Sequence, residues 1–315
     1  MQQRIFTALA AACLCLMTYG SAWAAGAGES LSVWIALSDA GGAHAEAAEA
    51  LRDGFERVQP RRVQWRVAHW SQFANPQPEP HWVVAVGTAA QRGIQQLFAG
   101  DATPPPLLSI LVPRLAFERG AEPARLRAGS LSAVFIDQPP ARQIELIRLA
   151  LPTVRNVGIL VGEESKGHAA ALEHAAKDRA LRLVTLPVSQ GGLFSSLQSL
   201  LADADVLLAL PDPTVFNSQT AASILTSAYR RQVPLIGFSP AWVKAGALLG
   251  LYSTPAQVGA RGAELLRQAL PGRNLPPPQW PREFVVAVNQ DVARSLGLAL
   301  DEPRLGEQLR QRERP

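Results

Sequence analysis

Short apolar runs separated by helical patterns recur along this chain, most clearly within residues 205–270. An apolar run at 206–210 leads into a helical pattern, and a second apolar run follows at 233–238. Buried parallel strands have this continuous apolar character, and parallel pairing requires a helical crossover. The segment therefore predicts a β-α-β unit. Asp212 and Ser239 follow its two strands, at the edge where open α/β sheets bind ligands.

The next segment predicts a further strand and a well-defined helix start. Residues 245–251 are small and apolar and lead to Tyr252. Thr254 is placed to cap the following helix, and Gln257 completes a Thr-x-x-Gln capping box. Gly272 is placed to end this helix, because glycine is the commonest residue after a helix carboxyl end.

The same alternation of strands and helices extends over the rest of the chain. Five strands are expected before the middle of the chain, at 31–37, 63–68, 82–86, 107–112 and 132–136. The later strands are expected at 157–161, 181–187, 206–210, 233–238 and 284–288. Helices are expected between them, including 43–58, 139–151, 167–180 and 194–202. Thr88 and Asp137 each follow a strand and are candidates to cap the next helix. The fold class expected is α/β, with parallel sheets in two lobes.

The two lobes are expected to be discontinuous in sequence. Residues 31–132 with 247–275 are assigned to the first lobe, and 133–246 with 284–298 to the second lobe. The reason is that 245–251 must return the chain to the first lobe before the Thr254 helix packs. The tail at 299–315 is expected to be solvated and frayed.

The first 24 residues have the form of a secretory signal peptide. Arg4 precedes an apolar stretch, and Ala22-Trp23-Ala24 has the small-x-small form of a cleavage site. The apolar stretch is too short for a stable membrane span. A lipid anchor at Cys13 fits less well, because the preceding leucine lies one place too far upstream. The mature protein is therefore expected in the periplasm.

Composition narrows the chemistry further. The 315 residues include 30 Lys and Arg against 26 Asp and Glu, which gives a formal charge of +4. The arginines are scattered, so nucleic acid is not expected as a partner. Both cysteines, Cys13 and Cys15, lie in the predicted signal peptide. No disulfide or thiol chemistry is then expected in the mature chain.

Sequence signatures of enzymes are weak. Gly26-Ala27-Gly28 precedes a strand and does not follow one, so it is no dinucleotide fingerprint. Gly237-Phe238-Ser239 begins like a nucleophile elbow, but Pro240 would remove the backbone N–H that serves the oxyanion. The five histidines are scattered. Neither catalysis, a metal nor a cofactor is expected.

Polar residues at strand ends are the better candidates, and they favour ligand binding. They are Ser38, Asp39, Thr88, Asp137, Asp212, Thr214, Asn217, Ser239 and Tyr252. The helix that opens at Thr88 offers free N–H groups suited to a carboxylate. Each candidate has an alternative interpretation as a cap or turn residue. For Asp212, between two prolines, ligand contact is favoured.

At these residues the chain resembles a known family. The similar segments are 51–55, 84–90, 143–147, 157–160 and 243–247, with Pro152, Pro234, Gly259, Asn289 and Leu296-Gly297. They resemble the substrate-binding proteins of ABC transporters with the type I periplasmic-binding fold, in the branch that includes binders of aromatic amino acids. The resemblance implies two Rossmann-like lobes, three crossing segments, and ligand contacts at Ser38/Asp39, Thr88 and Asp212/Thr214. Pro213 replaces an asparagine that is common in the family, which leaves the ligand open.

The expected function is therefore a periplasmic solute-binding protein. It would capture a small molecule, such as an amino acid or related carboxylate, and deliver it to an ABC permease and ATPase. A binding module that feeds a sensor or an outer-membrane receptor is the alternative. A hydrolase or transferase is the third interpretation.

Overall fold

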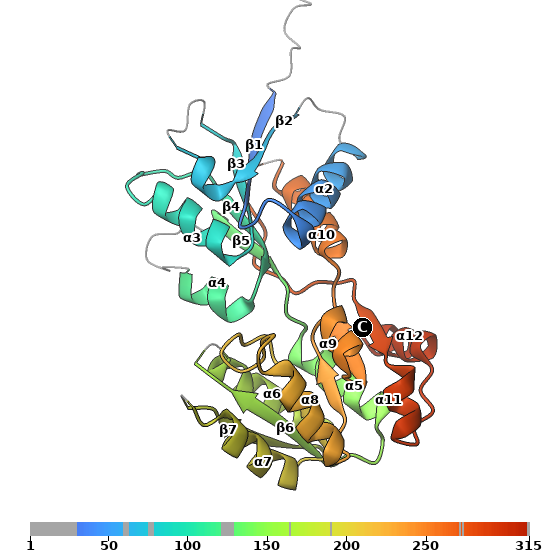
Figure 1. Cartoon of the computed structure of the whole chain (residues 1–315). Helices are drawn as coiled ribbons and strands as arrows, with labels where there is room; N and C mark the ends of the chain where they lie inside the picture. The colour runs from blue at the N-terminus through green and yellow to red at the C-terminus, as the bar shows by residue number, and fades with distance from the viewer. Residues whose placement is uncertain are drawn as a thin grey trace, which may run out of the picture.

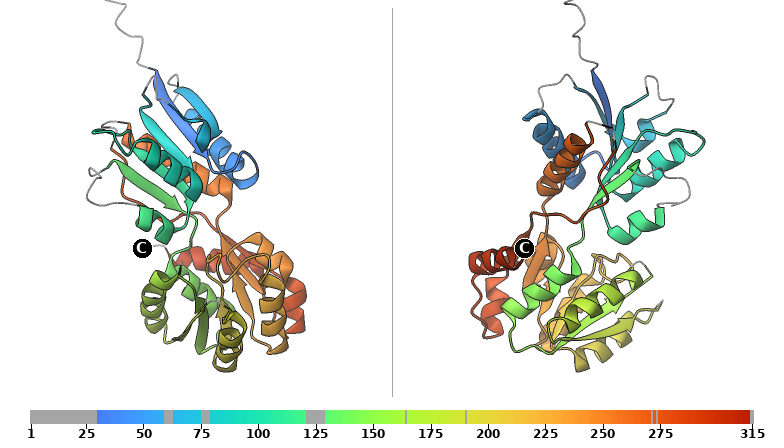
Figure 2. Two further views of the ribbon diagram at one scale, coloured as in Figure 1. Left: turned by 60° about the vertical axis from the view of Figure 1, so that its left-hand side comes forward. Right: turned by 180° about the vertical axis from the view of Figure 1, so that it is seen from behind.

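Two β-sheets, each covered by helices on both faces, organise the chain into two lobes (Figure 1). The structure is a computed structural model, and it describes residues 30–58, 63–74, 79–120, 129–163, 165–189, 191–270, 272 and 274–313. Views from two further sides show the lobes joined end to end by thin connecting segments (Figure 2). The predicted α/β class with two lobes is confirmed.

The first sheet is parallel, with the strand order β2-β1-β3-β4-β5. Its strands are β1 (Leu31–Leu37), β2 (Val63–His69), β3 (Trp82–Val86), β4 (Leu107–Val112) and β5 (Leu131–Phe135). Its helices are α2 (Gly42–Glu56), α3 (Thr88–Leu97), α4 (Arg114–Gly120) and α10 (Pro255–Ala269), with the short η1 (Trp70–Gln72). The side chains of α2 and α10 share one apolar core with the sheet, and those of α3 share another. Because both faces are covered, the strands β3 and β4 are buried along their whole length.

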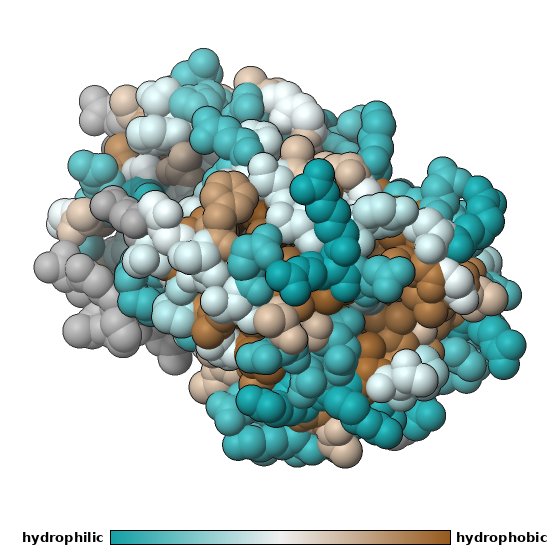
Figure 3. Space-filling view, turned by 60° about the horizontal axis from the view of Figure 1, so that its bottom comes forward, coloured by the Kyte–Doolittle hydropathy of each residue, from teal (hydrophilic) through white to brown (hydrophobic). Residues whose placement is uncertain are grey.

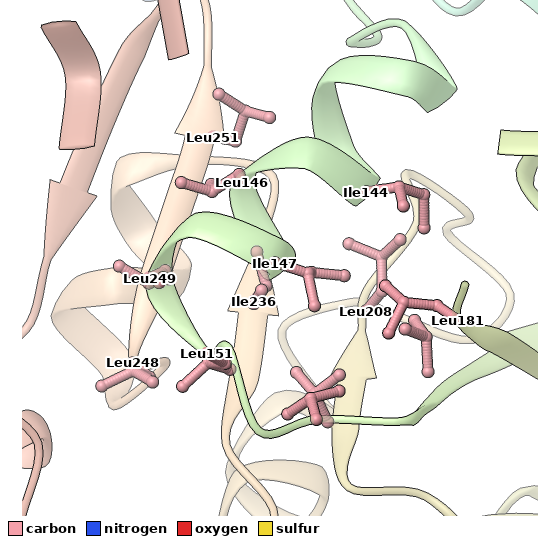
Figure 4. Packing of buried hydrophobic residues seen from close by; sticks show 14 of the residues in the cluster. Ile144, Leu146, Ile147, Leu151, Leu181, Leu208, Ile236, Leu248, Leu249 and Leu251 are labelled. Carbon is pink, nitrogen blue, oxygen red and sulfur yellow. The ribbon is translucent and has the colours of Figure 1, made fainter. Parts of the chain in front are cut away.

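The second sheet has the order β11-β10-β9-β8-β6-β7 and is parallel except for β11. Its strands are β6 (Asn156–Val161), β7 (Arg182–Pro187), β8 (Val206–Leu208), β9 (Leu235–Gly237), β10 (Leu249–Tyr252) and β11 (Val285–Val288). Its helices are α5 (Pro140–Ala150), η3 (Lys166–His168), α6 (Ala169–Lys177), α7 (Leu193–Asp203), α8 (Ala221–Arg230), α9 (Pro240–Ala245), α11 (Gln290–Ser295) and α12 (Glu302–Arg312). Residues of α5, α6 and α12 pack on one face, and those of α7, α8 and α9 on the other. Figure 4 shows Ile144, Leu146 and Ile147 of α5 packed against strand residues of this lobe.

The chain passes between the lobes three times. The crossing segments are residues 136–139 after β5, 253–254 after β10, and the stretch between α10 and β11. The third segment runs beside β5 on its way, as the parallel bridge between Val134 and Gln279 indicates. The three crossings expected from the family resemblance are thus present.

The start of α10 is the best example of a local signal that the structure confirms. The Thr254 hydroxyl accepts a hydrogen bond from the Gln257 N–H at 3.1 Å, and the Gln257 side chain accepts one from the Thr254 N–H at 2.8 Å. These two bonds form the predicted capping box. They fix the direction in which the second crossing segment enters the first lobe.

The expected lobe boundaries differ from the sheet membership in two places. Leu249–Tyr252 was assigned to the first lobe, but it forms β10 between β9 and β11 in the second sheet. Residues 133–135, assigned to the second lobe, belong to β5 in the first sheet. The physical reason is that an apolar strand in the interior needs partners on both edges, and β9 and β11 supply them for β10. The chain therefore crosses at 253–254, later than expected.

The prediction of a frayed tail is wrong. Asp301 caps α12 by accepting a hydrogen bond from the Arg304 N–H at 3.0 Å. Leu305 and Leu309, one helical turn apart, are buried in the core of the second lobe. The many charged residues of the tail hid this narrow apolar stripe.

Seen from the second lobe, the surface is mostly hydrophilic with separate apolar areas (Figure 3). Among the described residues, no helix has both the length and the apolar character needed to cross a membrane. The predicted signal peptide at residues 1–24, with Cys13 and Cys15, lies outside the described residues.

The packing of α10 on α2 yields the first prediction. A Cβ atom added at Gly259 would overlap the carbonyl oxygen of Ala47 on α2. We expect Gly259→Ala to lower the free energy of unfolding by about 1–3 kcal/mol through overpacking, despite the higher helix propensity of alanine. Urea unfolding followed by circular dichroism measures this change.

Gly100→Ala is the matched control for Gly259→Ala, because no heavy atom lies within 4 Å of a Cβ added at Gly100. We expect the control to change stability by less than about 0.5 kcal/mol. Equal stability of the two variants would contradict the prediction that α10 packs too closely on α2 at Gly259 to admit a Cβ atom.

Candidate functional site

The carboxyl ends of the strands in the two sheets face each other across the lobe boundary. A Cβ added at Gly167 of the second lobe would lie 2.8 Å from a methyl carbon of Leu115 in the first lobe. The charge of Arg114, beside Leu115, also acts on His168. The start of α4, which follows β4, therefore meets η3, which follows β6. We call the loops after β1, β3, β4 and β5 of one lobe, and after β6, β8 and β9 of the other, the interlobe face.

Ser38 and Gly87 form a tight corner in the first lobe. The Ser38 N–H donates to the Val86 carbonyl at 2.9 Å, and its hydroxyl accepts a hydrogen bond from the Ala90 N–H at 2.8 Å. Gly87 has a φ of 90°, which favours glycine. A Cβ at Gly87 would also lie 2.6 Å from the Ser38 hydroxyl oxygen.

This corner corrects the prediction that Thr88 caps α3. Gly87 is the capping residue and Thr88 is the first residue of the helix. The Ser38 hydroxyl, 52 positions upstream of Ala90, supplies the capping acceptor. The first two N–H groups of the helix, those of Thr88 and Ala89, have no partner within the helix by geometry. They lie beside the half-buried Thr88 side chain, with the positive end of the helix dipole.

Asp137 is a buried carboxyl group at the interlobe face. Its side chain is 5% exposed, and one oxygen accepts a hydrogen bond from the Arg114 N–H at the start of α4. Its other oxygen, Oδ1, has no hydrogen-bond partner among the described residues. Burial raises the pKa of Asp137 from 3.8 to about 6, and the bond from Arg114 opposes this rise only in part.

The position of Asp137 also corrects a prediction made from the sequence. The residue was expected to cap the helix that follows it, but Pro139 precedes α5 and no side chain caps that helix. Asp137 instead accepts a hydrogen bond from the N–H at the start of α4, the helix that follows the neighbouring strand β4. Its Oδ1 is an unsatisfied acceptor among the described residues, and a donor group of a bound molecule would satisfy it.

Asp212 has a structural role that differs from the expected ligand contact. It is 0% exposed. Its Oδ2 accepts hydrogen bonds from the Gly162 N–H at 3.1 Å and the Ser165 hydroxyl at 2.7 Å. Its Oδ1 accepts from the N–H of Thr214 at 2.9 Å and from its hydroxyl at 2.6 Å. These four bonds fill the acceptor positions of the carboxylate, so Asp212 ties the loops after β6 and β8 together.

Asn217 also maintains the loop after β8. Its side-chain oxygen accepts hydrogen bonds from the N–H groups of Gln219 and Thr220, and its amide donates to the Pro213 carbonyl. The exposed Thr214 donates its hydroxyl to Asp212. The polar side chains of this loop therefore hold each other.

The remaining predicted residues fall into two groups. Ser239 precedes α9 without capping it and is half-buried, and Asp39 is exposed next to Ser38. Both therefore have side chains available at strand ends. Tyr252 was expected on the first lobe but lies in β10, and its ring passes 3.3 Å from a Cβ added at Gly250. Burial raises the pKa of Tyr252, and the charge of Glu302 on α12 adds to this. The ring thus packs over its own sheet.

Two histidines that were not predicted as site residues, His44 and His168, lie at the interlobe face. His168 follows β6 in η3, is 7% exposed, and has its pKa lowered from 6.5 to about 4. Burial is the main cause and the charge of Arg114 adds to it, while Asp212 acts in the opposite direction. The ring is therefore neutral near pH 7. His44 of α2 lies beside the corner, with Nε2 2.6 Å from a Cβ added at Gly87.

The signal that could have identified both histidines is their position after a strand. As metal ligands, the histidines gave no signal in the sequence because they are scattered. Among the described residues, no group of three or more His, Cys, Asp or Glu could hold a metal ion. What the interlobe face offers is hydrogen-bond donors and acceptors from two lobes.

Comparison with known proteins gives this arrangement a class. Residues 134–307, over half of the chain, match the family described as ABC transporter substrate binding protein. No match was found among curated proteins. Solved structures with the same fold include an ABC domain in complex with L-Trp from Streptococcus pneumonia (17% identity, TM-score 0.61, covering 88% of this chain and 98% of that chain).

Two other structures are similar over most of their length. One is a substrate-binding protein with adhesive properties from Clostridium difficile in its ligand-free, open structure (18% identity, TM-score 0.66, 86% of this chain and 96% of that chain). The other is a periplasmic ribose ABC transporter protein from Conexibacter woesei (12% identity, TM-score 0.52, 87% and 96%).

The fold, two α/β lobes with facing strand ends, is that of a type I periplasmic binding protein. The chain belongs to the family of ABC transporter substrate-binding proteins.

The bonds of Asp212 yield the second prediction. In Asp212→Asn the amide NH2 group faces hydrogen-bond donors in either orientation, those of Gly162 and Ser165 or those of Thr214. We expect the free energy of unfolding to fall by on the order of 3 kcal/mol, because several charge-assisted hydrogen bonds are lost in a buried position. Asp39→Asn is the control, since Asp39 is exposed. Thermal and urea unfolding compare the two, and a stability of Asp212→Asn equal to that of the control would contradict the structural role.

The raised pKa of Asp137 yields a third prediction. Because the folded-state pKa rises from 3.8 to about 6, ionising Asp137 costs stability. Its contribution is greatest below pH 3.8 and is lost as the pH rises through about 6. Asp137→Asn does not titrate, so we expect wild type to lose on the order of 3 kcal/mol relative to this variant over that range.

Urea unfolding of wild type and of Asp137→Asn between pH 3.8 and about 6 measures this difference in stability. His168, whose pKa is lowered, acts in the opposite sense: its contribution is present above pH 6.5 and is lost as the pH falls through about 4. Both proteins contain His168, so its effect cancels in the comparison. A difference in stability that does not change with pH would contradict the prediction.

Proposed function

We propose that this protein binds a small molecule between its two lobes and delivers it to an ABC permease and its ATPase, without chemical conversion. The observation that carries the proposal is the buried Oδ1 of Asp137, which has no hydrogen-bond partner among the described residues. It lies at the lobe boundary, because the charge of Arg114 acts both on Asp137 and on His168 of the other lobe. A buried carboxylate oxygen without a partner costs free energy that a donor on a ligand would recover.

The proposed ligand is an amino acid or a related carboxylate. Its carboxylate would bind the N–H groups of Thr88 and Ala89, which have no partner within α3, at the helix end that Ser38 fixes. Its ammonium or hydroxyl would donate to Asp137 Oδ1. One solved protein with a similar fold is in complex with L-Trp, and another is described as a periplasmic ribose ABC transporter. Sugars are therefore the competing class of ligand.

The proposed contacts come from both lobes. In the first lobe they are Ser38, Asp39, Thr88 and Asp137, and in the second lobe they are Thr214, Ser239 and His168. Asp212 and Asn217 would act by holding the loop after β8 in place. Tyr252 lies outside this set, because its ring packs on the second sheet.

The proposed location is the periplasm. The first 24 residues have the pattern of a cleaved signal peptide. Membership of a transporter substrate-binding family agrees with a protein that works outside the inner membrane. Capture there would precede transfer to the permease.

The test is a thermal-shift screen of amino acids, other carboxylates and sugars, followed by calorimetric titration. A true ligand raises the melting temperature by mass action. We expect Asp137→Asn to weaken binding about tenfold or more, because a charge-assisted hydrogen bond is lost. Asp203→Asn, exposed on α7, is the matched control and should bind like wild type. Unchanged affinity in Asp137→Asn would move the site elsewhere. Binding of sugars alone would contradict the carboxylate class.

A further inference from the structure

A buried polar network joins the three segments that cross between the lobes. In the first segment, the Gln138 amide donates to the Ser253 hydroxyl of the second segment at 3.0 Å. The Ser253 hydroxyl donates to the Glu283 carbonyl of the third segment at 2.6 Å. Gln138 and Ser253 are both buried. Each crossing segment thus contributes one member, and none of these bonds belongs to a helix or a sheet.

Arg142, in the first turn of α5, binds the same network. Its Nη1 donates to the Gln138 side-chain oxygen at 2.7 Å and to the Pro281 carbonyl at 3.0 Å. The guanidinium also lies 4.3 Å from the centre of the Phe284 ring. Arg142 is only 6% exposed, so its charge is removed from water and needs a counter-charge nearby.

Glu313, which directly follows α12, supplies this counter-charge. Its carboxylate accepts two hydrogen bonds from Arg142, from Nε at 2.5 Å and from Nη2 at 2.9 Å. This two-point geometry fixes the plane of the guanidinium. Helix α12 is itself held to the second lobe by the buried Leu305 and Leu309. Glu313 is therefore linked through Arg142 to the first and third crossing segments, and through Gln138 to the second.

We propose that Arg142 and Glu313 are positioning residues that hold the hinge in one arrangement and so set the angle between the lobes. Hinge closure requires backbone rotation in a few residues at the ends of elements. Gln138, Ser253 and Pro281 lie in these crossing segments, and the hydrogen bonds of the network hold them. Without the Glu313 carboxylate, the guanidinium must turn toward water, and its bonds to the first and third segments are lost.

The consequence for ligand affinity rests on the proposed function, but the effect on the hinge does not. Affinity depends on how much of the protein occupies the arrangement that closes on a ligand. The distance between the lobes can be measured with no ligand present. Failure of the screen for ligands would therefore leave this inference untouched, and the reverse also holds.

The experiment measures the distance between spin labels on the two lobes of the full chain. Labels are attached through Asp53→Cys on α2 and Asp203→Cys on α7, both exposed, in a background with Cys13→Ser and Cys15→Ser. We expect one narrow distance for wild type. For Glu313→Gln we expect a broadened distribution, with the mean shifted by about 2 Å or more. The Glu313 side chain is 31% exposed, so this variant is expected to fold.

A second variant and a control separate the hinge effect from simple loss of helix packing. Arg142→Lys keeps the charge but loses the fork, and should broaden the distribution like Glu313→Gln. Glu145→Gln removes the ion pairs of α5 with Arg179 and with Arg312 of α12, without touching a crossing segment. It should keep the distribution of wild type. Distributions of Glu313→Gln and Arg142→Lys that equal the wild-type distribution, or that Glu145→Gln reproduces, would overturn the proposal.

Discussion

Parallel strand pairing is the constraint on which this structure depends. In a parallel sheet all carboxyl ends lie on one edge, and each strand needs a helix to return the chain. Both sheets follow this rule, with β11 as the exception. Helices then cover both faces of each sheet, and the strand interiors become apolar. Polar chemistry is left to the strand-end loops, which is why the candidate site gathers at one edge of each lobe.

The parts of the fold that could be predicted are those with local signals. Continuous apolar runs located the strands, because burial on both faces requires them. The box of Thr254 and Gln257 located the start of α10, because both hydrogen bonds join residues three positions apart. The class of protein also followed, since many such local segments occur in the order expected for one family.

The failures share a different cause, which is a partner far away in the sequence. Thr88 was expected to cap α3, but Ser38 supplies the acceptor from 52 positions upstream of Ala90. Asp212 looked free in its loop, but Gly162 and Ser165, about fifty positions upstream, occupy one of its oxygens. No local pattern contains these partners. The same holds for β10, whose membership in the second sheet is decided by its pairing with β9 and β11.

The groups at the lobe boundary carry an energetic cost that connects the fold to the proposed function. Asp137 and His168 are both buried, and burial moves their pKa values in opposite directions, each toward the neutral form. A folded protein tolerates such a cost where a site is kept ready for a partner. A donor placed at Asp137 Oδ1 would remove part of the cost, and the lobes must be correctly placed for the donor to reach it. The hinge network around Arg142 would therefore influence the free energy of ligand binding, although it shares no residue with the candidate site.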